Sequence, residues 1–234
     1  MDTIVVIILG AAGSILALAV LALLGRTRVA LLVLGRRYRL ADVLRRGGIT
    51  KFNLSRDDYG RTLRTYLSQA QHSIRIISVS LKVTHDEGDF VGLFRTRLAQ
   101  NPSFRVAVSL LAPASTAAEC VTASLDLTRD ELDREITEML GMLMSLKNSL
   151  QSGQRERLEI RVHECLPMGS AIMLDAEPER GIIQIETKLH RSPRAESFGF
   201  EIKGPSDFYN RHYRAWMLVW DESREPRPNE YSRR

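Results

Sequence analysis

Cysteine is scarce in this chain of 234 residues. Only Cys120 and Cys165 are present, and they lie in no spacing that would hold a metal ion. Two isolated cysteines are ordinary for a reducing compartment and do not suggest a disulfide scaffold. The sequence also has no glycine-rich phosphate loop, no Gly-x-Ser-x-Gly motif and no His-Glu-x-x-His motif. It therefore offers no motif for nucleotide hydrolysis, serine hydrolysis or zinc proteolysis, and we expect no cofactor and no metal.

Beyond residue 50 the chain has no excess of either charge, with 26 basic and 26 acidic side chains. The first 50 residues hold seven arginines and two aspartates, which gives them a net charge of +5. The sequence pI of about 9.5 therefore comes from this first part. A nucleic-acid-binding domain would need a basic face of its own, so nucleic acid is not an expected partner.

The longest apolar run is Thr3–Leu24, which has 22 residues without a charge or a proline. At about 1.5 Å per helical residue, it covers the roughly 30 Å hydrocarbon core of a bilayer. A cleaved signal peptide would need a basic start and a small-residue cleavage site, whereas only Met1 and Asp2 precede this run. We therefore expect residues 1–25 to form one transmembrane helix that is retained as an anchor.

Residues 26–50 form a basic segment beside this anchor. An excess of arginine next to a span predicts that the following domain lies in the cytoplasm, as in a single-pass protein of the cell membrane. Such side chains also attract anionic lipid headgroups. The arginines expected to contact headgroups are Arg26, Arg28, Arg36, Arg37 and Arg39. The small residues Gly10–Ser14 leave open a close helix pair, and hence a homodimer.

The pattern of apolar residues beyond residue 50 predicts alternating helices and strands, and then a β-rich last third. This order indicates an α/β fold in which helices flank a mixed sheet. A capping box at Thr128–Glu131 should start a long helix whose methionine-bearing stripe we interpret as core, with a dimer contact as the alternative. The expected strands are Ser73–Val83, Phe104–Leu111, Leu158–His163, Ala171–Leu174, Gly181–Leu189 and Ser197–Ile202.

Two further segments are polar. The acidic loop His85–Asp89 is interpreted as solvated and not as a cation site. Residues 223–234 are charged and contain proline, so we expect a flexible tail. The domain itself is expected to span residues 51–222.

The stretch LEIRVHECLPMGSAIMLD, followed by AESFGFE, resembles a half-domain of the phospholipase D superfamily. In that family one strand carries histidine, one spacer, lysine, four spacers and aspartate, and a small polar pair follows. The resemblance covers roughly residues 51–222, up to a closing helix that contains tryptophan. It is greatest to the degenerate members found in bacterial regulatory proteins, and it implies their phospholipase D-like sheet flanked by helices.

The catalytic pair of that motif is replaced in this chain. Counting back from Asp175, Ser170 stands at the lysine position and Met168 at the histidine position. The family's histidine attacks phosphorus and its lysine holds the developing phosphate charge. A thioether and a hydroxyl cannot take these roles, so the resemblance implies a domain without ordinary phospholipase D chemistry. Of the motif, Asp175 and the small polar Ser197 remain.

Three functions follow from these observations. We expect a membrane-anchored, non-catalytic sensor or regulatory domain that binds a ligand or a protein partner. The first alternative is a residual phosphodiesterase that acts on phospholipids or nucleotides. The second is a dimerising scaffold, since single-motif members of the family pair two halves across a shared cleft. The candidate ligand-binding residues are Ser170, Asp175, Ser197, His163, His190, Lys188 and Glu201.

Overall fold

The computed structural model describes residues 42, 44, 46–54, 62–81, 90–124, 127–165, 169–187 and 197–231. The chain divides into two compact units, Met1–Arg46 and Gly47–Arg234, and the fold presented below is that of the second. The expected anchor Thr3–Leu24, the five headgroup arginines and the loop His85–Asp89 lie outside the described residues. Among the helices that are described, none is long and apolar enough to cross a membrane.

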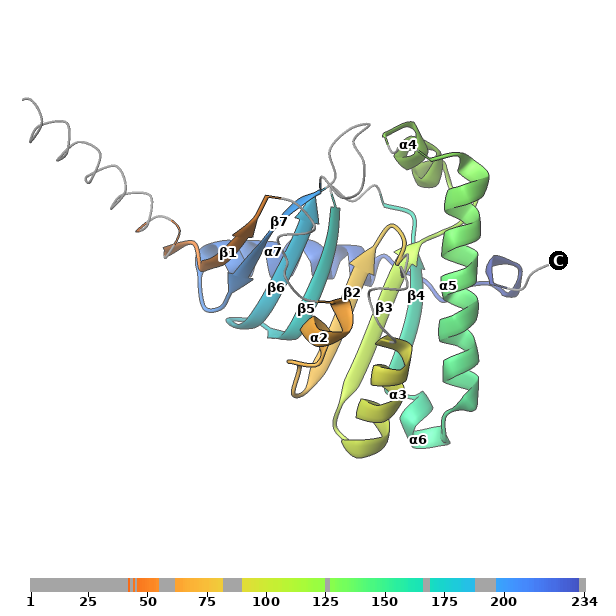
Figure 1. Ribbon diagram of the computed structural model, residues 1–234, viewed down its shortest axis with the longest axis horizontal. Helices are drawn as coiled ribbons and strands as arrows, with labels where there is room; N and C mark the ends of the chain where they lie inside the picture. Colours follow the sequence, from red (N-terminus) through yellow and green to blue (C-terminus); the bar gives the residue numbers. More distant parts are fainter. Residues whose placement is uncertain are drawn as a thin grey trace, which may run out of the picture. The chain divides into compact units, whose positions relative to one another are not determined.

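The described residues of the second unit form one seven-stranded mixed sheet with the order β1-β7-β6-β5-β2-β3-β4 (Figure 1). Strands β2, β3 and β4 are parallel to one another, and every other neighbouring pair is antiparallel. The strands are β1 (Ile49–Asn53), β2 (Ser73–Ser78), β3 (Arg105–Leu111), β4 (Leu158–His163), β5 (Gly169–Glu177), β6 (Arg180–Thr187) and β7 (Phe198–Lys203).

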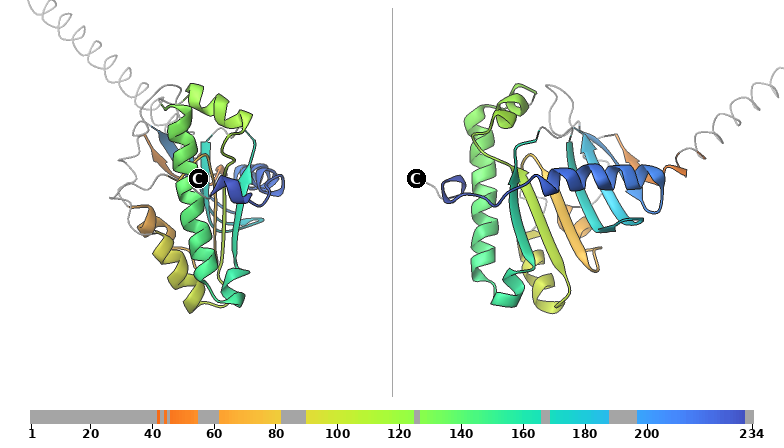
Figure 2. Two further views of the ribbon diagram at one scale, coloured as in Figure 1. Left: turned by 90° about the vertical axis from the view of Figure 1, so that its right-hand side faces the viewer. Right: turned by 180° about the vertical axis from the view of Figure 1, so that it is seen from behind.

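Helices cover both faces of this sheet. Helices α2, α3 and α5 lie over one face, whereas α7 runs across the other, as the view from behind in Figure 2 shows. The helices are α2 (Leu63–Leu67), α3 (Phe90–Gln100), α4 (Thr116–Ser124), α5 (Arg129–Ser149), α6 (Ser152–Arg155), α7 (Asp207–Asp221) and the short 3-10 turn η4 (Pro228–Glu230). The expected mixed sheet flanked by helices is confirmed.

Helix α5 begins where the sequence predicts. The Thr128 hydroxyl accepts a hydrogen bond from the backbone N–H of Glu131 at 3.3 Å, and the Glu131 carboxylate accepts one from the Thr128 N–H at 2.8 Å. This capping box satisfies two N–H groups that the first helical turn leaves without partners. Lys147 lies in the last turn, where the helix dipole favours a positive charge.

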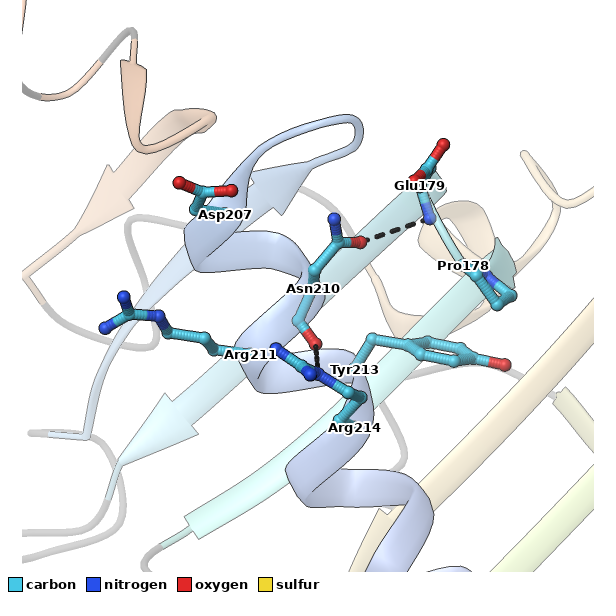
Figure 3. Close-up of a pocket in the computed structure, with 7 residues that line it drawn as sticks. All are labelled: Pro178, Glu179, Asp207, Asn210, Arg211, Tyr213 and Arg214. Atoms are coloured by element: carbon cyan, nitrogen blue, oxygen red, sulfur yellow. Dashed lines mark hydrogen bonds between the residues drawn. The ribbon is translucent and has the colours of Figure 1, made fainter.

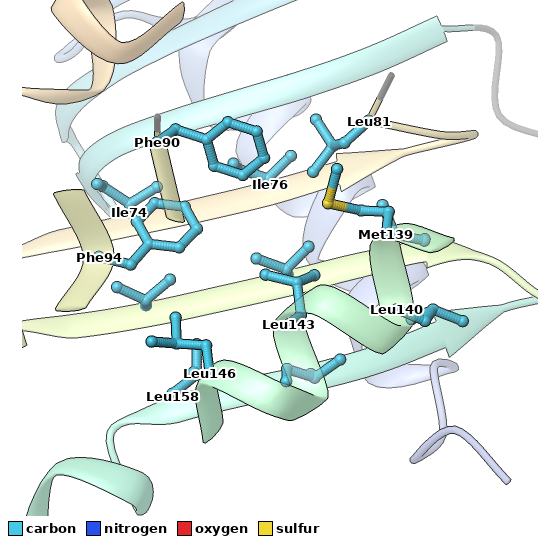
Figure 4. Close-up of a cluster of buried hydrophobic side chains, with 14 of the residues drawn as sticks. Ile74, Ile76, Leu81, Phe90, Phe94, Met139, Leu140, Leu143, Leu146 and Leu158 are labelled. Atoms are coloured by element: carbon cyan, nitrogen blue, oxygen red, sulfur yellow. The ribbon is translucent and has the colours of Figure 1, made fainter. Parts of the chain in front are cut away.

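The buried face of α5 forms the larger core together with α3 and the parallel strands (Figure 4). Met139 is buried in this core, so the methionine-bearing stripe packs inside the domain as predicted. Buried side chains of α5 recur every three or four residues, which keeps them on one helix face. They are Leu132, Ile136, Met139, Leu140, Leu143 and Leu146.

A smaller core lies between α7 and the opposite face of the sheet. Ser206 caps α7 by accepting a hydrogen bond from the Tyr209 N–H at 3.0 Å. Tyr209, Trp216 and Trp220 are the buried residues of this helix and pack on isoleucines of β6 and β7. Because these aromatic rings bury large areas, α7 fixes the antiparallel half of the sheet.

Both limits of the domain differ from those expected from the sequence. Strand β1 begins at Ile49, inside the expected basic segment, and it pairs with β7 far away in the sequence. Residues 223–231 do not form a free tail, because Arg224 exchanges two backbone hydrogen bonds with Val162 of β4. The Arg224 guanidinium also binds the Glu230 carboxylate at 2.8 Å. Burial raises the pKa of Glu230, but the contacts with Arg224 and Arg227 outweigh this effect and lower the pKa below its usual range.

Candidate functional site

The carboxyl ends of the parallel strands meet at one edge of the sheet. Ser78 ends β2 and His163 ends β4, and the register of β2, β3 and β4 aligns these ends. Strand β5 runs antiparallel to β2, so its first residues, Gly169 and Ser170, lie at the same edge. In open α/β sheets, ligands bind outside the carboxyl ends of strands. We call this edge the serine edge.

Two buried serine hydroxyls join β2 to β5 at the serine edge. The Oγ atoms of Ser78 and Ser170 are 2.8 Å apart, and Ser78 Oγ also donates to the carbonyl of Ser80 at 2.8 Å. A serine hydroxyl has one proton, so Ser170 must be the donor to Ser78. Ser170 is thus a neutral donor whose lone pairs remain available, at the position where the resemblance places a lysine.

His163 is almost completely buried behind this pair, with 1 % of its surface exposed. Its Nε2 lies 3.2 Å from the Ser78 carbonyl oxygen and its Nδ1 lies 3.3 Å from the Cys165 carbonyl oxygen. Burial lowers the pKa of His163 below its ordinary 6.5, while the two carbonyl contacts oppose this shift. Both ring nitrogens therefore face backbone carbonyl groups, and neither faces solvent. Through these contacts His163 links the end of β4 to the end of β2.

The network continues into helix α5 through two residues that the sequence did not suggest. Ser80 Oγ donates to Glu135 Oε2 at 3.4 Å, which connects the end of β2 to the long helix. A possible signal was the alternation Ser78-Val79-Ser80, which places two hydroxyls at the end of an apolar strand. Glu135 carried no such signal, because its role depends on how α5 packs.

A polar row continues from the serine edge across β6, β7 and β1. Glu201 pairs with Gln184 on one side and with Lys51 on the other, so these three residues share the face that bears Ser170. Gln184 is 7 % exposed and Asn53 is 1 % exposed. Among the described residues, the Gln184 Oε1 and Asn53 Nδ2 atoms have no hydrogen-bond partner. Buried polar atoms usually have partners, so this row has unused hydrogen-bonding capacity.

Asp175 lies at the other end of β5, about 17 Å from Ser170 at the usual rise of an extended strand. Its carboxylate accepts hydrogen bonds from the backbone N–H groups of Gln71, His72 and Ser73 at 2.9, 2.7 and 2.8 Å. The residue also has a left-handed backbone, with φ of 50°. Asp175 therefore anchors the start of β2 and does not join the serine edge.

The remaining predicted site residues divide into two groups. Ser197 is buried immediately before β7, beyond the Phe198–Thr187 pair that places it near the serine edge. Lys188, His190 and Met168 lie outside the described residues. The structure thus brings Ser170, His163 and Ser197 to one edge, places Glu201 in the adjoining polar row and separates Asp175 from them.

A hollow of about 500 Å³ lies at the opposite edge of the sheet, between the β5–β6 turn and α7 (Figure 3). The Asn210 side-chain oxygen accepts a hydrogen bond from the Glu179 N–H at 3.2 Å, which ties the turn to the helix. The lining of this hollow contains two acidic and two basic side chains, so its charge does not favour an anionic ligand. The lining residues are Pro178, Glu179, Asp207, Asn210, Arg211, Tyr213 and Arg214.

Metal-binding groups are not clustered in the part of the chain that the structure describes, where no three His, Cys, Asp or Glu residues are placed to hold an ion.

Cys165 donates from its Sγ to the Glu222 carboxylate at 3.1 Å. Burial raises the pKa of this thiol, and the neighbouring Glu222 raises it further. A thiol with a raised pKa is a poor nucleophile, so Cys165 is not a catalytic candidate.

Comparison with known proteins gives a family without a known activity. No curated protein matches the chain. The family model that matches is DUF5919, described as a domain of unknown function, and it covers residues 59–211. This range includes β2 to β7 and the first turn of α7, and therefore the whole serine edge. Because the match covers more than half of the sequence, the chain belongs to the DUF5919 family.

Proposed function

We propose that the protein is a membrane-anchored sensor whose cytoplasmic, phospholipase D-like domain binds a ligand at the serine edge without catalysing a reaction. The anchor and the orientation rest on the apolar run Thr3–Leu24 and the arginines that follow it. The phospholipase D-like assignment is supported by β5, a central strand that carries both the Ser170 and the Asp175 positions.

The observation that carries this proposal is the hydrogen bond between Ser170 and Ser78. The position at which the family would hold phosphate charge is occupied by a neutral hydroxyl whose proton is already donated to Ser78. Such a group can accept a hydrogen bond from a ligand, but it cannot stabilise an anionic transition state as a cation does. The arrangement favours recognition over phosphoryl chemistry.

The chemistry of the adjoining polar row favours an uncharged ligand. Glu201 lies in the row, Glu186 pairs with Ser170 across the sheet, and Glu135 lies behind the serines. Lys51 adds one positive charge to the row, but the three carboxylates outnumber it, and this acidic excess would repel a phosphate group. The Gln184 oxygen and the Asn53 nitrogen have no partner within the described part of the chain, and they suit a molecule with both hydrogen-bond donors and acceptors, such as a nucleoside or a sugar.

The alternative function, a residual phosphodiesterase, needs a histidine that can reach substrate. His163 is buried and both of its ring nitrogens contact backbone carbonyls, which does not favour it as a nucleophile. His190 lies outside the described residues, so its candidacy remains a prediction from the sequence. The scaffold function likewise remains a prediction.

Binding and turnover measured on the same sample would separate these functions. The full chain, in a mild detergent, would be incubated with phosphodiesters, cyclic nucleotides, phospholipid vesicles, neutral nucleosides and neutral sugars, and its melting temperature recorded with product formation. We expect a neutral nucleoside or sugar to raise the melting temperature without turnover. Ser170→Ala and Gln184→Ala should remove this shift. Ser109→Ala, which breaks a similar buried serine pair with Ser223 on the α7 face, should keep it.

Other outcomes would redirect the assignment. Turnover that disappears in His163→Ala or His190→Ala would establish the phosphodiesterase and end the sensor proposal. A melting temperature unchanged by every compound, without turnover, would move the assignment to protein partners. Loss of the shift in Ser109→Ala as strongly as in Ser170→Ala would mean that the serine edge is not the binding site.

A further inference from the structure

Four phenylalanines form a continuous row on the α7 face of the sheet, where β1 and β7 meet helix α7. Phe52 of β1 is the cross-strand neighbour of Phe200, and its ring lies 6.1 Å from that of Phe198. The Phe200 ring in turn stacks with Phe208 of α7 at 6.1 Å. We call Phe52, Phe198, Phe200 and Phe208 the aromatic row.

One end of this row is open to solvent. Phe52 is 56 % exposed, and Leu54, one residue past the end of β1, is 74 % exposed. The other end is packed, since His212 meets the Phe208 ring edge-on at 4.5 Å and burial lowers its pKa. The row is thus packed against α7 at one end and leaves two large apolar side chains in solvent at the other.

The position of β1 in the sequence indicates what covers this end. Strand β1 is the first strand after the basic segment, and 24 residues separate its start at Ile49 from the end of the apolar run at Leu24. Even a fully extended chain of this length spans only about 80 Å. If residues 3–24 cross a bilayer, Phe52 and Leu54 are the first exposed large apolar side chains of the domain beyond the lipid surface.

We propose that the exposed end of the aromatic row inserts into the headgroup region of the membrane and thereby orients the domain. This inference rests on the proposed anchoring. Phenylalanine and leucine are side chains that partition into the bilayer interface, and basic residues add attraction to anionic lipids. Arg211 on α7 is exposed three residues from Phe208, and the acidic Asp207 lies beside the same ring. Lys203 ends β7 on the opposite face of the sheet, the face that also bears Glu201.

The size of the exposed end agrees with a lipid contact better than with a second copy of the chain. Phe52 and Leu54 together expose on the order of 250 Å² of side chain, whereas each partner of a standard interface buries about 800 Å². The pairing of β1 with β7 shifts register between Ile49 and Lys51, and such a bulge discourages pairing with another strand. A small area suffices against a membrane, because the anchor keeps its local concentration high.

The test uses the full chain in vesicles of phosphatidylcholine and phosphatidylglycerol. Cys120→Ser and Cys165→Ser remove the native thiols, and an environment-sensitive fluorophore is attached at Leu54→Cys. Its matched control is Leu218→Cys, a leucine of similar exposure, 63 %, on α7. We expect brominated lipids to quench the probe at position 54 several-fold more strongly than the probe at position 218. Adding Phe52→Ser should bring the two values together, and a cooperative melting transition checks that the variant is still folded.

Flotation of the same samples separates failure of this inference from failure of the anchoring proposal. A chain that does not float with the vesicles would end both. A chain that floats but shows equal quenching at the two positions would overturn the lipid contact alone. A probe at position 54 that is shielded from water yet not quenched by brominated lipids would also overturn it, and would indicate a second protein surface.

Discussion

Strand β5 carries the motif positions Ser170 and Asp175 at its two ends, and these ends differ in burial, charge and hydrogen bonding. At the Ser170 end, a buried neutral hydroxyl donates to another serine, beside a histidine whose pKa is lowered by burial. At the Asp175 end, a half-exposed carboxylate accepts three backbone N–H groups. One end has hydrogen-bonding capacity left for a ligand, while the other uses its capacity to hold the fold.

This difference teaches that the parts of a catalytic motif can be retained for separate reasons. Asp175 is explained by the start of β2, which needs an acceptor for three consecutive N–H groups, whether or not a reaction takes place. Replacing the residue at position 170 leaves that requirement unchanged. The aspartate is therefore weak evidence for catalysis, and its loss should be felt in stability.

The largest effect is expected at the Asp175 end. Asp175→Ala removes the acceptor of three hydrogen bonds and places alanine in a left-handed backbone. Both changes destabilise, and together they should lower the free energy of unfolding by about 2–4 kcal/mol. Asp175→Asn, which tolerates this backbone and keeps one oxygen acceptor, should lose less. Chemical denaturation of both variants measures these values.

An exposed acidic residue provides the control for this prediction. Asp130→Ala, in the first turn of α5, should cost less than about 1 kcal/mol, because it affects only the helix dipole. Should Asp175→Ala instead leave stability unchanged and abolish ligand binding, the comparison of the two ends would be wrong and Asp175 would belong to the site.

A smaller effect is expected from pH, and it arises at the serine-edge end. Burial lowers the pKa of His163 below 6.5 in the folded state, and burial also lowers that of His212. Between these folded-state values and 6.5, the unfolded chain binds more protons than the folded one. Stability should therefore be highest above pH 6.5 and fall as the pH decreases, by at most about 1.4 kcal/mol per pH unit for each histidine.

His163→Gln tests this assignment, because glutamine can still donate to a carbonyl oxygen but does not titrate in this range. The variant should reduce the slope of stability against pH between pH 7 and 5, as measured by denaturation at a series of pH values. The His212→Gln variant gives the contribution of the second histidine. An unchanged slope in His163→Gln would mean that folding does not shift the pKa of His163, and it would remove the contrast between the two ends.

The smallest effect is expected from the serine pair. Ser78→Ala and Ser170→Ala, measured singly and together, should show a coupling of about 0.5–1.5 kcal/mol, typical of a buried hydrogen bond between neutral groups. The matched cycle uses Ser109 and Ser223, whose Oγ atoms are 3.0 Å apart. If the two serine pairs have equal coupling energies but only the Ser78–Ser170 pair affects ligand binding, the Ser170 end of β5 is distinguished by its function and not by its stability. A coupling near zero for the first pair would mean that Ser170 does not donate to Ser78.

Strands with clear alternation could be predicted from the sequence, whereas those set by distant pairing could not. Strand β4 was predicted with its observed bounds, because Leu158, Ile160 and Val162 face one core. Strand β1 was missed, since its five residues have a single neighbour in the sheet and depend on β7 for their position. Residues 223–231 were misjudged as a flexible tail because their composition is polar, although Arg224 binds both β4 and Glu230.

The candidate site was predictable only in part. Ser170 and Ser197 followed from the motif, and His163 from its place at the end of an alternating strand. Ser78 and Glu135 were not found, because their side chains come together only when β2, β5 and α5 pack. The sequence motif groups Asp175 with Ser170 because only five positions separate them. In an extended strand, however, this separation places the two residues at opposite ends of β5.

The docking of Arg224 on β4 also affects how the protein avoids self-association. Within the described sheet, β4 is the outer strand at one side, and Val162 exchanges two backbone hydrogen bonds with Arg224. These bonds occupy donors and acceptors that would otherwise offer a template for another chain. The residues after α7 thus act as a short cap on the sheet, and a chain shortened to residue 222 would expose an unprotected strand at which aggregation could begin.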